Sequence, residues 1–281
     1  WSVVYHVRLP RIMLALVAGM GLSISGASFQ ALFSNPLATP DTLGVATGAS
    51  FGAVLALLFT RNVFVVQLAA LAMGLAALAG TCMISRLNGK SSILMVVLGG
   101  MVVSSLFQAL VSLVKYVADP DEDLPAITYW LMGSMSRATY QGLAVGIPLI
   151  LLGVALLFLL RWRLNILSLQ EDETRALGID VRKLRIMVMA ASTLVTASCV
   201  SLCGQVGWVG LLIPHVARML YGSDNRKIIP VSMGLGSAFM VVIDTASRAA
   251  TAAEIPVSIL TAIIGAPFFI ILLRRTGGAR L

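Results

Sequence analysis

The chain has 281 residues, of which 58% are hydrophobic and only 11% charged, and its formal net charge is +8. Soluble globular domains carry about 25% charged residues, so a large soluble core is excluded and a polytopic membrane protein is predicted. The three cysteines (Cys82, Cys199, Cys203) lie in apolar stretches without metal-ligand spacing, which assigns them to packing and argues against a metalloenzyme.

Nine membrane-spanning helices are predicted, and the fold class is therefore all-α. The criterion is a stretch of about 20 apolar residues. The spans run roughly over Ile12–Phe33, Thr42–Phe59, Val63–Ser85, Ser91–Val114, Gln141–Leu160, Ile186–Cys203, Val206–Leu220, Ile228–Ser247 and Ile255–Leu273. The sixth and seventh come from one run, 186–217, that holds no Asp, Glu, Lys or Arg. We divide it at Gly204–Gln205–Val206–Gly207, because glycine permits a tight reversal.

Lysine and arginine set the predicted orientation. With the N-terminal end outside and the spans threaded alternately, 14 of the 20 basic residues lie on the inner side and six on the outer side. Cytoplasmic loops carry such an excess, so the C-terminal end is predicted to be cytoplasmic. The positive net charge is thus a topology signal, and no nucleic-acid partner is expected. Residues 114–134, with the acidic run 119–123, are predicted to form an outer loop and a short helix.

Small residues mark the expected helix contacts. Gly44, Gly48 and Gly52 recur every four positions, so they would lie on one helix face and let a neighbour approach closely in lipid. The pairs Gly99–Gly100 and Gly234/Gly236 suggest similar contacts. A pore-lining role is the alternative for these glycines.

The inner loop 161–185 is the longest polar segment between spans. Residues 168–178 are typical of a helix, with Ser168 as the cap and Gly178 at the end. A second short helix is expected over 179–185, with Asp180 near its start. The loop is either a solvated connector with topogenic charge or a docking surface for a soluble partner, and its apolar residues favour docking. We treat residues 1–281 as one transmembrane domain that contains this loop.

The predicted spans are almost free of charge. Ion-driven transporters keep costly charged groups within their spans, and here Asp244 is the main exception. It lies four residues before Arg248, so the two side chains can pair on one helix face near the outer end. Energy for transport is therefore expected to enter through another subunit.

Three long stretches resemble one protein family. They are RLPRIMLALVAGMGLSISGASFQALFSNPLATPDTLGVATGASFG (8–52), LQEDETRALGIDVRKLR (169–185), and GQVGWVGLLIPHVARMLYGSDNRKIIPVS (204–232) followed by DTASRAATAAEIPVSILTAIIGAPFFIILL (244–273). In order and over essentially the whole chain, they resemble FecCD-type permeases. These are membrane subunits of ATP-binding-cassette (ABC) importers for ferric siderophores, haem, vitamin B12 or molybdate. The family has ten spans, so the resemblance implies that its first span is missing from this chain.

The resemblance implies a set of partners. Two permeases form a homodimer in the lipid bilayer of a bacterial or archaeal cytoplasmic membrane, two copies of an ABC ATPase bind below, and a periplasmic substrate-binding protein docks above. Outer basic residues of the family meet glutamates of the binding protein, which by motif position assigns Arg8, Arg11 and Arg248. Arg8 and Arg11 could instead only snorkel to the interface, and Arg248 could serve Asp244 alone.

The inner side receives two assignments from the resemblance. The turn Asn35–Pro36–Leu37 matches the family's cytoplasmic gate, with Asn35 bonding freed backbone groups and Leu37 plugging the channel. A simple helix-breaking turn is the alternative, and residues 88–91 could form a second gate element. Six residues match the helix that couples to the ATPase: Glu171, Thr174, Arg175, Ala176, Leu177 and Gly178.

The expected function is import of a metal chelate, with a ferric siderophore as the first choice and haem, cobalamin or molybdate as alternatives. The chain has no Walker A pattern, so ATP and Mg²⁺ are expected on the ATPase, and no cofactor, metal or catalytic residue is assigned here. An ion-coupled secondary transporter or channel and a membrane-embedded enzyme are the rival classes. Transport without an ATPase would favour the first rival.

Overall fold

The computed structural model describes residues 1–85, 93–168, 180–251 and 254–276. These ranges contain helices and turns and no strand. A short π-helix, η1 (Val4–Arg8), leads into α1 (Leu9–Leu32), and a 3-10 turn, η2 (Pro40–Leu43), precedes α2. The other elements are α2 (Val45–Phe59), α3 (Val63–Ser85), α4 (Ile93–Val117), α5 (Asp123–Leu131), α6 (Tyr140–Leu164), η3 (Asn165–Ser168), α8 (Val181–Cys203), α9 (Val209–Tyr221), α10 (Asn225–Ala250) and α11 (Val257–Thr276).

Each of the nine predicted spans corresponds to a helix. Six helices in the described ranges are long and apolar enough to cross a membrane, and α2, α9 and the apolar part of α11 are shorter apolar helices. The predicted break falls where expected: α8 ends at Cys203, and Gly204 takes a φ of 71° that favours glycine. The short outer helix predicted within 114–134 is α5.

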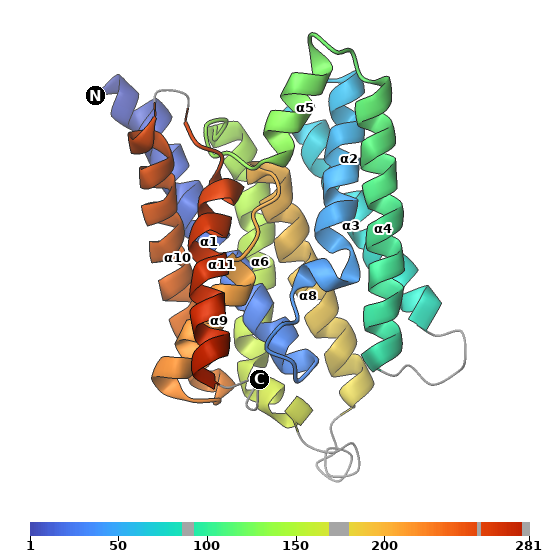
Figure 1. Cartoon of the computed structure of the whole chain (residues 1–281), viewed down its shortest axis with the longest axis vertical. Helices are drawn as coiled ribbons and strands as arrows, with labels where there is room; N and C mark the ends of the chain where they lie inside the picture. The colour runs from blue at the N-terminus through green and yellow to red at the C-terminus, as the bar shows by residue number, and fades with distance from the viewer. Residues whose placement is uncertain (86–92, 169–179, 252–253, 277–281) are drawn as a thin grey trace.

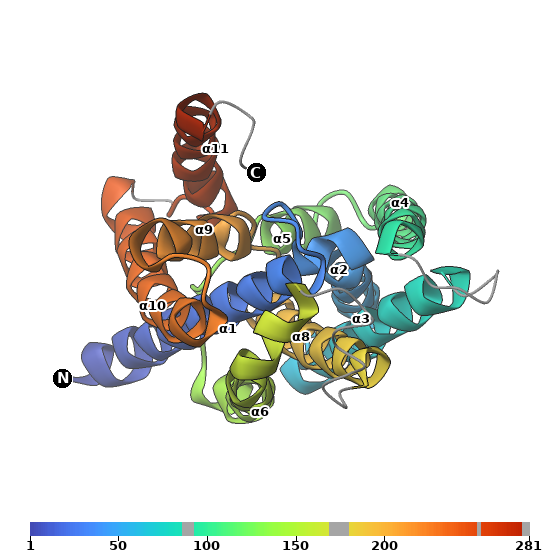
Figure 2. The same ribbon diagram turned by 90° about the horizontal axis from the view of Figure 1, so that it is seen from below.

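The helix α1 forms the centre of the bundle (Figures 1 and 2). It runs down from the N-terminal end in Figure 1, and in the view from below it crosses between α9 and α10 on one side and α6 and α8 on the other. In the most apolar 18-residue stretch of α1, 72% of the stretch is buried within this chain, and the share is the same in α8. The corresponding shares are 28% in α3 and 22% in α4. The core therefore follows α1 and α8, and α4 and α11 lie at the periphery.

Glycines bring α1 against its neighbours. A Cβ on Gly19 would overlap the carbonyl oxygen of Gly236 in α10, and a Cβ on Gly26 would overlap the Gly210 backbone in α9. Such contacts let two backbones touch, which is how helices associate in lipid without a hydrophobic driving force. Gly236 was predicted to make a close contact, but Gly234 has no atom of the described structure within 4 Å of its would-be Cβ.

The predicted Gly44/Gly48/Gly52 stripe is only partly right. Gly48 and Gly52 face α3 as a pair. Gly44 instead precedes α2, has a φ of 75°, and lies against Ser104 of α4. The second short helix predicted over 179–185 is also wrong, because Asp180 caps the long helix α8 directly, accepting a hydrogen bond from the Lys183 N–H at 3.0 Å.

Candidate docking and gating sites

A buried charge cluster lies at the outer end of α1 and α10. Arg11 is 4% exposed, and its Nε donates to Asp244 Oδ1 at 2.6 Å. Its Nη1 donates to both carboxylate oxygens of Glu254, at 2.8 and 2.9 Å. Arg248 reaches the other oxygen of Asp244, with Nε 3.2 Å from Oδ2. We call these four residues the outer charge cluster.

The cluster balances two cations against two carboxylates. A buried ion pair stabilises a protein only when both charges keep their partners, because each charge loses hydration. Asp244 is 1% exposed; it accepts a hydrogen bond from Arg11 of α1 and forms an ion pair with Arg248 of its own helix, α10. Arg11 therefore holds α1, α10 and the segment before α11 together.

These positions revise the predicted docking residues. Arg11 was expected to face a binding protein, but its guanidinium is buried and occupied by Asp244 and Glu254, so neither docking nor snorkelling describes it in this structure. The predicted pairing of Arg248 with Asp244 is confirmed. Arg8, in η1, is exposed, and its docking role stays a prediction.

Sequence reasoning missed Glu254. The only hint was that Asp244, Arg248 and Glu254 fall within eleven residues at the outer end. The structure adds a backbone reason, since Glu254 has a φ of 44° and is followed by Ile255, whose N–H donates to the Ser247 carbonyl at 3.1 Å. This local turn directs the Glu254 side chain back toward Arg11.

The first residues of α11 are also fixed to the outer turn after α5. The Val257 N–H donates to the Gly133 carbonyl at 3.0 Å, and Ser258 Oγ donates to the Met132 carbonyl at 2.5 Å. From the same turn, the Ser134 N–H donates to the Cys203 carbonyl at 2.9 Å. The outer ends of α5, α8, α10 and α11 are thus joined by main-chain and side-chain bonds.

At the opposite end of α1 lies the gate turn, which we define as Asn35–Pro36–Leu37. The Leu37 N–H donates to Asn35 Oδ1 at 2.9 Å, so Asn35 does bond freed backbone groups, as predicted. The Asn35 N–H in turn donates to the Gln30 carbonyl at 3.1 Å. The Leu37 side chain is 46% exposed, so it is free to contact another surface, and its gating role remains a prediction.

Just beyond the gate turn, η2 carries an acidic residue that the sequence analysis did not single out. The protein packed around Asp41 withdraws water from its carboxyl group and raises its pKa to about 6, although part of the side chain is exposed. The main-chain carbonyl of Asp41 accepts from the Gly44 N–H at 3.0 Å. The main chain of Asp41 is therefore fixed in η2, just before α2.

The predicted ATPase-coupling residues Glu171, Thr174, Arg175, Ala176, Leu177 and Gly178, and the second gate element at 88–91, lie outside the described residues. Both ends of the inner loop 161–185, which contains the predicted coupling residues, are described. Asn165 Nδ2 donates to Asp224 Oδ1 at 2.8 Å, and the Asn225 N–H donates to Asn165 Oδ1 at 2.8 Å. These bonds fix the start of the loop to the turn between α9 and α10.

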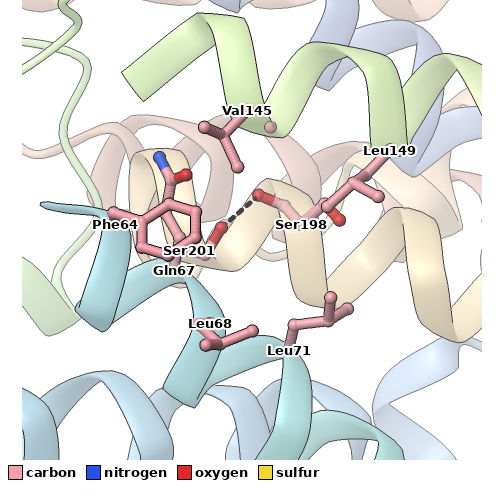
Figure 3. A pocket seen from close by; sticks show the side chains of 9 residues that line it. Phe64, Gln67, Leu68, Leu71, Val145, Leu149, Ser198 and Ser201 are labelled. Carbon is pink, nitrogen blue, oxygen red and sulfur yellow. Dashed lines mark hydrogen bonds between the residues drawn. The ribbon is translucent and has the colours of Figure 1, made fainter. Parts of the chain in front are cut away.

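A small cavity lies between α3, α6 and α8 (Figure 3). Its volume is about 40 Å³, and the polar residues in its lining are Gln67, Ser198 and Ser201. Gln67 Nε2 donates to the Gly142 carbonyl at 3.1 Å, and Ser201 Oγ donates to the Ser198 carbonyl at 2.8 Å. Among the described residues, the other six that line the cavity are apolar or glycine.

Comparison with known proteins agrees with this architecture. Residues 1–275 match the FecCD transport family. The molybdate import system permease protein MolB of Haemophilus influenzae is 42% identical, with the match covering 98% of this chain and 81% of that protein. The cobalamin import system permease protein BtuC of Halobacterium salinarum is 39% identical, over 97% of this chain and 73% of that protein.

A solved structure extends the agreement to three dimensions. An inward-facing metal-chelate type ABC transporter superposes with a TM-score of 0.93 at 41% identity, covering 98% of this chain and 88% of that one. The helical bundle and the family match thus describe the same protein class. The chain belongs to the FecCD transport family, whose members are inner-membrane permeases of ABC importers for metal chelates, haem, vitamin B12 and molybdate.

Proposed function

We propose that this chain is the permease of an ABC importer that works as a homodimer and passes a ferric chelate from a periplasmic binding protein to the cytoplasm. The observation that carries the proposal is the family match over residues 1–275. The scarcity of charged residues in the predicted spans supports it, because an ion-driven carrier needs charged groups on its pathway. The main buried acid, Asp244, is already neutralised by Arg11 and Arg248.

On the outer side, we assign binding-protein contact to Arg8 and to the exposed part of Arg248. Both lie at the outer end of the bundle, and Arg8 is exposed. Arg11 takes a different part in this scheme: it holds the outer charge cluster together underneath that surface. A glutamate of the binding protein would pair with Arg8 by charge complementarity.

On the inner side, the gate turn closes the pathway in the dimer by placing Leu37 against its copy. The 46% exposure of Leu37 supports this role, because the side chain is accessible to a partner surface. Glu171, Thr174, Arg175, Ala176, Leu177 and Gly178 contact the ATPase, which binds ATP and Mg²⁺ and supplies the motion. The permease itself then catalyses no reaction.

Molybdate is the second candidate cargo, favoured by the 42% identity to a molybdate permease. Metal analysis of the cognate binding protein, purified with its ligand, separates the two: iron supports the ferric chelate, and molybdenum without iron contradicts it. Uptake into proteoliposomes that contain permease, ATPase and binding protein tests the transport class. ATP-dependent uptake is expected, whereas uptake without the ATPase that follows an ion gradient would contradict the proposal.

A further inference from the structure

Helix α9 contains a proline that removes one of its own hydrogen bonds. Pro214 lies inside the helix and has no N–H, so the carbonyl of Gly210, four residues earlier, lacks its usual helical donor. An unpaired carbonyl is unfavourable within a membrane, where no water replaces the missing donor. The structure fills this position from another helix: Gln30 Nε2 of α1 lies 3.3 Å from the Gly210 oxygen and 3.4 Å from the Leu211 oxygen.

The close approach of the two helices makes this bond possible. A Cβ on Gly26 would lie 2.5 Å from the carbonyl carbon of Gly210 and 2.6 Å from its Cα, so the two backbones meet at a pair of glycines. Gln30 is one turn beyond Gly26 on α1 and is 3% exposed. Its side chain therefore reaches the α9 backbone directly and is shielded from water.

The orientation of the Gln30 amide is set by Arg218. The Arg218 Nη2 atom donates to Gln30 Oε1, which leaves the NH₂ end of the amide facing α9. Among the described residues no carboxylate forms an ion pair with Arg218, and its side-chain hydrogen bond goes to the Gln30 amide. One guanidinium thus selects which end of Gln30 meets the Gly210 carbonyl.

The main chain of Gln30 carries the gate turn. Its carbonyl oxygen accepts the Asn35 N–H at 3.1 Å, and Asn35 Oδ1 then accepts the Leu37 N–H at 2.9 Å. The side chain of Gln30 holds α9, and its main chain holds the turn that contains Leu37. A shift of α9 relative to α1 therefore acts on Gln30, whose carbonyl oxygen accepts the hydrogen bond from the turn.

We propose that Gln30 is a positioning residue that couples α9 to the gate turn, with Arg218 fixing its amide for that purpose. The proposal rests on the proposed gating role of Leu37. It assigns to α9 and the turn a common movement within each subunit. Without the Gln30 amide, α9 and the turn move independently, and ATP hydrolysis no longer drives closure reliably.

The test uses the complete complex of permease, ATPase and binding protein in proteoliposomes, with uptake and ATP hydrolysis measured together. For Gln30→Leu we expect cargo moved per ATP to fall about tenfold, the effect that loss of about one buried hydrogen bond has on an equilibrium, while ATP hydrolysis persists. Ser25→Ala is the matched control, because it removes a buried bond between α1 and α8 and leaves α9 untouched. A parallel fall in uptake and hydrolysis would overturn the proposal.

A double-mutant cycle makes the test specific to the missing hydrogen bond. Pro214→Ala restores an N–H that can reach the Gly210 carbonyl, so Gln30→Leu is expected to lose less coupling in that background. An equal loss in both backgrounds would contradict the proposal.

A second pair of variants tests Arg218. Arg218→Lys, which retains a donor, is expected to keep more coupling than Arg218→Met. Equal losses from these two variants would show that Arg218 does not fix the Gln30 amide.

A spectroscopic arm separates this inference from the gating assignment. Spin labels at Leu37→Cys and Tyr221→Cys, both placed in only one subunit of the dimer, report the distance between the turn and the end of α9 within that chain. Gln30→Leu is expected to broaden that distance distribution, and an unchanged distribution would overturn the coupling. If instead Leu37→Ala leaves ATP-driven uptake and leak unchanged, the gating assignment fails, and the distance measurement still decides whether Gln30 joins the two elements.

Discussion

The two ends of α1 are held by different chemistry. At the outer end, Arg11 joins three segments through charged bonds to Asp244 and Glu254. At the inner end, a neutral amide, Gln30, joins α1 to α9 beside a contact of two glycines. Charge-assisted bonds are about twice as strong as neutral ones. The outer end has three of them, all between Arg11 and carboxylates, whereas the inner end has one, from Arg218 to the neutral Gln30 amide, so the outer end is the firmer of the two. The comparison indicates a fixed outer frame and an inner end that can rearrange.

Breaking the outer charge cluster is expected to have the largest effect. Arg11→Met leaves Asp244 and Glu254 without their shared cation, and removing one partner of a buried pair costs about 3–5 kcal/mol. The check is the free energy of unfolding in detergent. Arg61→Met is the control, because Arg61 is 61% exposed where it meets Asp123, and exposed pairs contribute about 0–1 kcal/mol. Equal losses from the two variants would contradict the firm outer frame.

Forcing α1 away from α10 is the next largest change. Gly19→Val places a branched side chain against the Gly236 carbonyl, and overpacking of this kind costs about 1–3 kcal/mol. Gly234→Ala provides the matched control on α10, since nothing in the described structure lies within 4 Å of a Cβ there. Thermal unfolding should separate the pair clearly. Similar midpoints would show that the α1–α10 contact is looser than described.

A pH-dependent effect is expected near the inner end, from Asp41. Its pKa in the folded protein is about 6, above the ordinary value of 3.8, so folding favours the protonated form. The stability that Asp41 contributes is therefore present at pH values below about 4 and is lost as the pH rises through about 6. Asp41→Asn should flatten this dependence, seen as a smaller change in unfolding midpoint between pH 4 and pH 7. An unchanged pH profile would show that Asp41 is well hydrated.

The smallest effect is expected from the gate turn itself. Asn35→Ala removes the acceptor of the Leu37 N–H in an exposed turn, so the free energy of unfolding should change by about 0.5–1.5 kcal/mol or less. Uptake should fall more than stability, because the turn loses its shape where Leu37 is needed. Full uptake and normal leak in this variant would contradict the gating role and favour a simple helix-breaking turn.

The sequence was sufficient for the helices because the membrane imposes a length and a composition on every span. The break at Gly204 followed from a charge-free run too long for one helix, and the pairing of Asp244 with Arg248 followed from helical spacing. These signals are local. Each depends on residues within a few turns of one another, which a single sequence displays directly.

The contacts between distant segments could not be predicted in this way. Arg11 and Glu254 are 243 positions apart, and Gln30 and Arg218 are 188 apart, so nothing in their spacing connects them. Arg11 was therefore predicted to be a surface residue, and no role was predicted for Gln30. Gly44 was misplaced for a related reason: the repeat of glycines was real, but α2 begins only after it.

The distinction between a fixed outer frame and a rearranging inner end has a direct test. In the assembled complex, spin labels on Val3→Cys and Ala250→Cys report the outer distance between the start of the chain and the end of α10, and labels on Leu37→Cys report the distance between the two gate turns of the dimer. With ATP bound, we expect an unchanged outer distance and a shifted inner one. A shift confined to the outer pair, or an inner distance that stays the same with and without ATP, would contradict it.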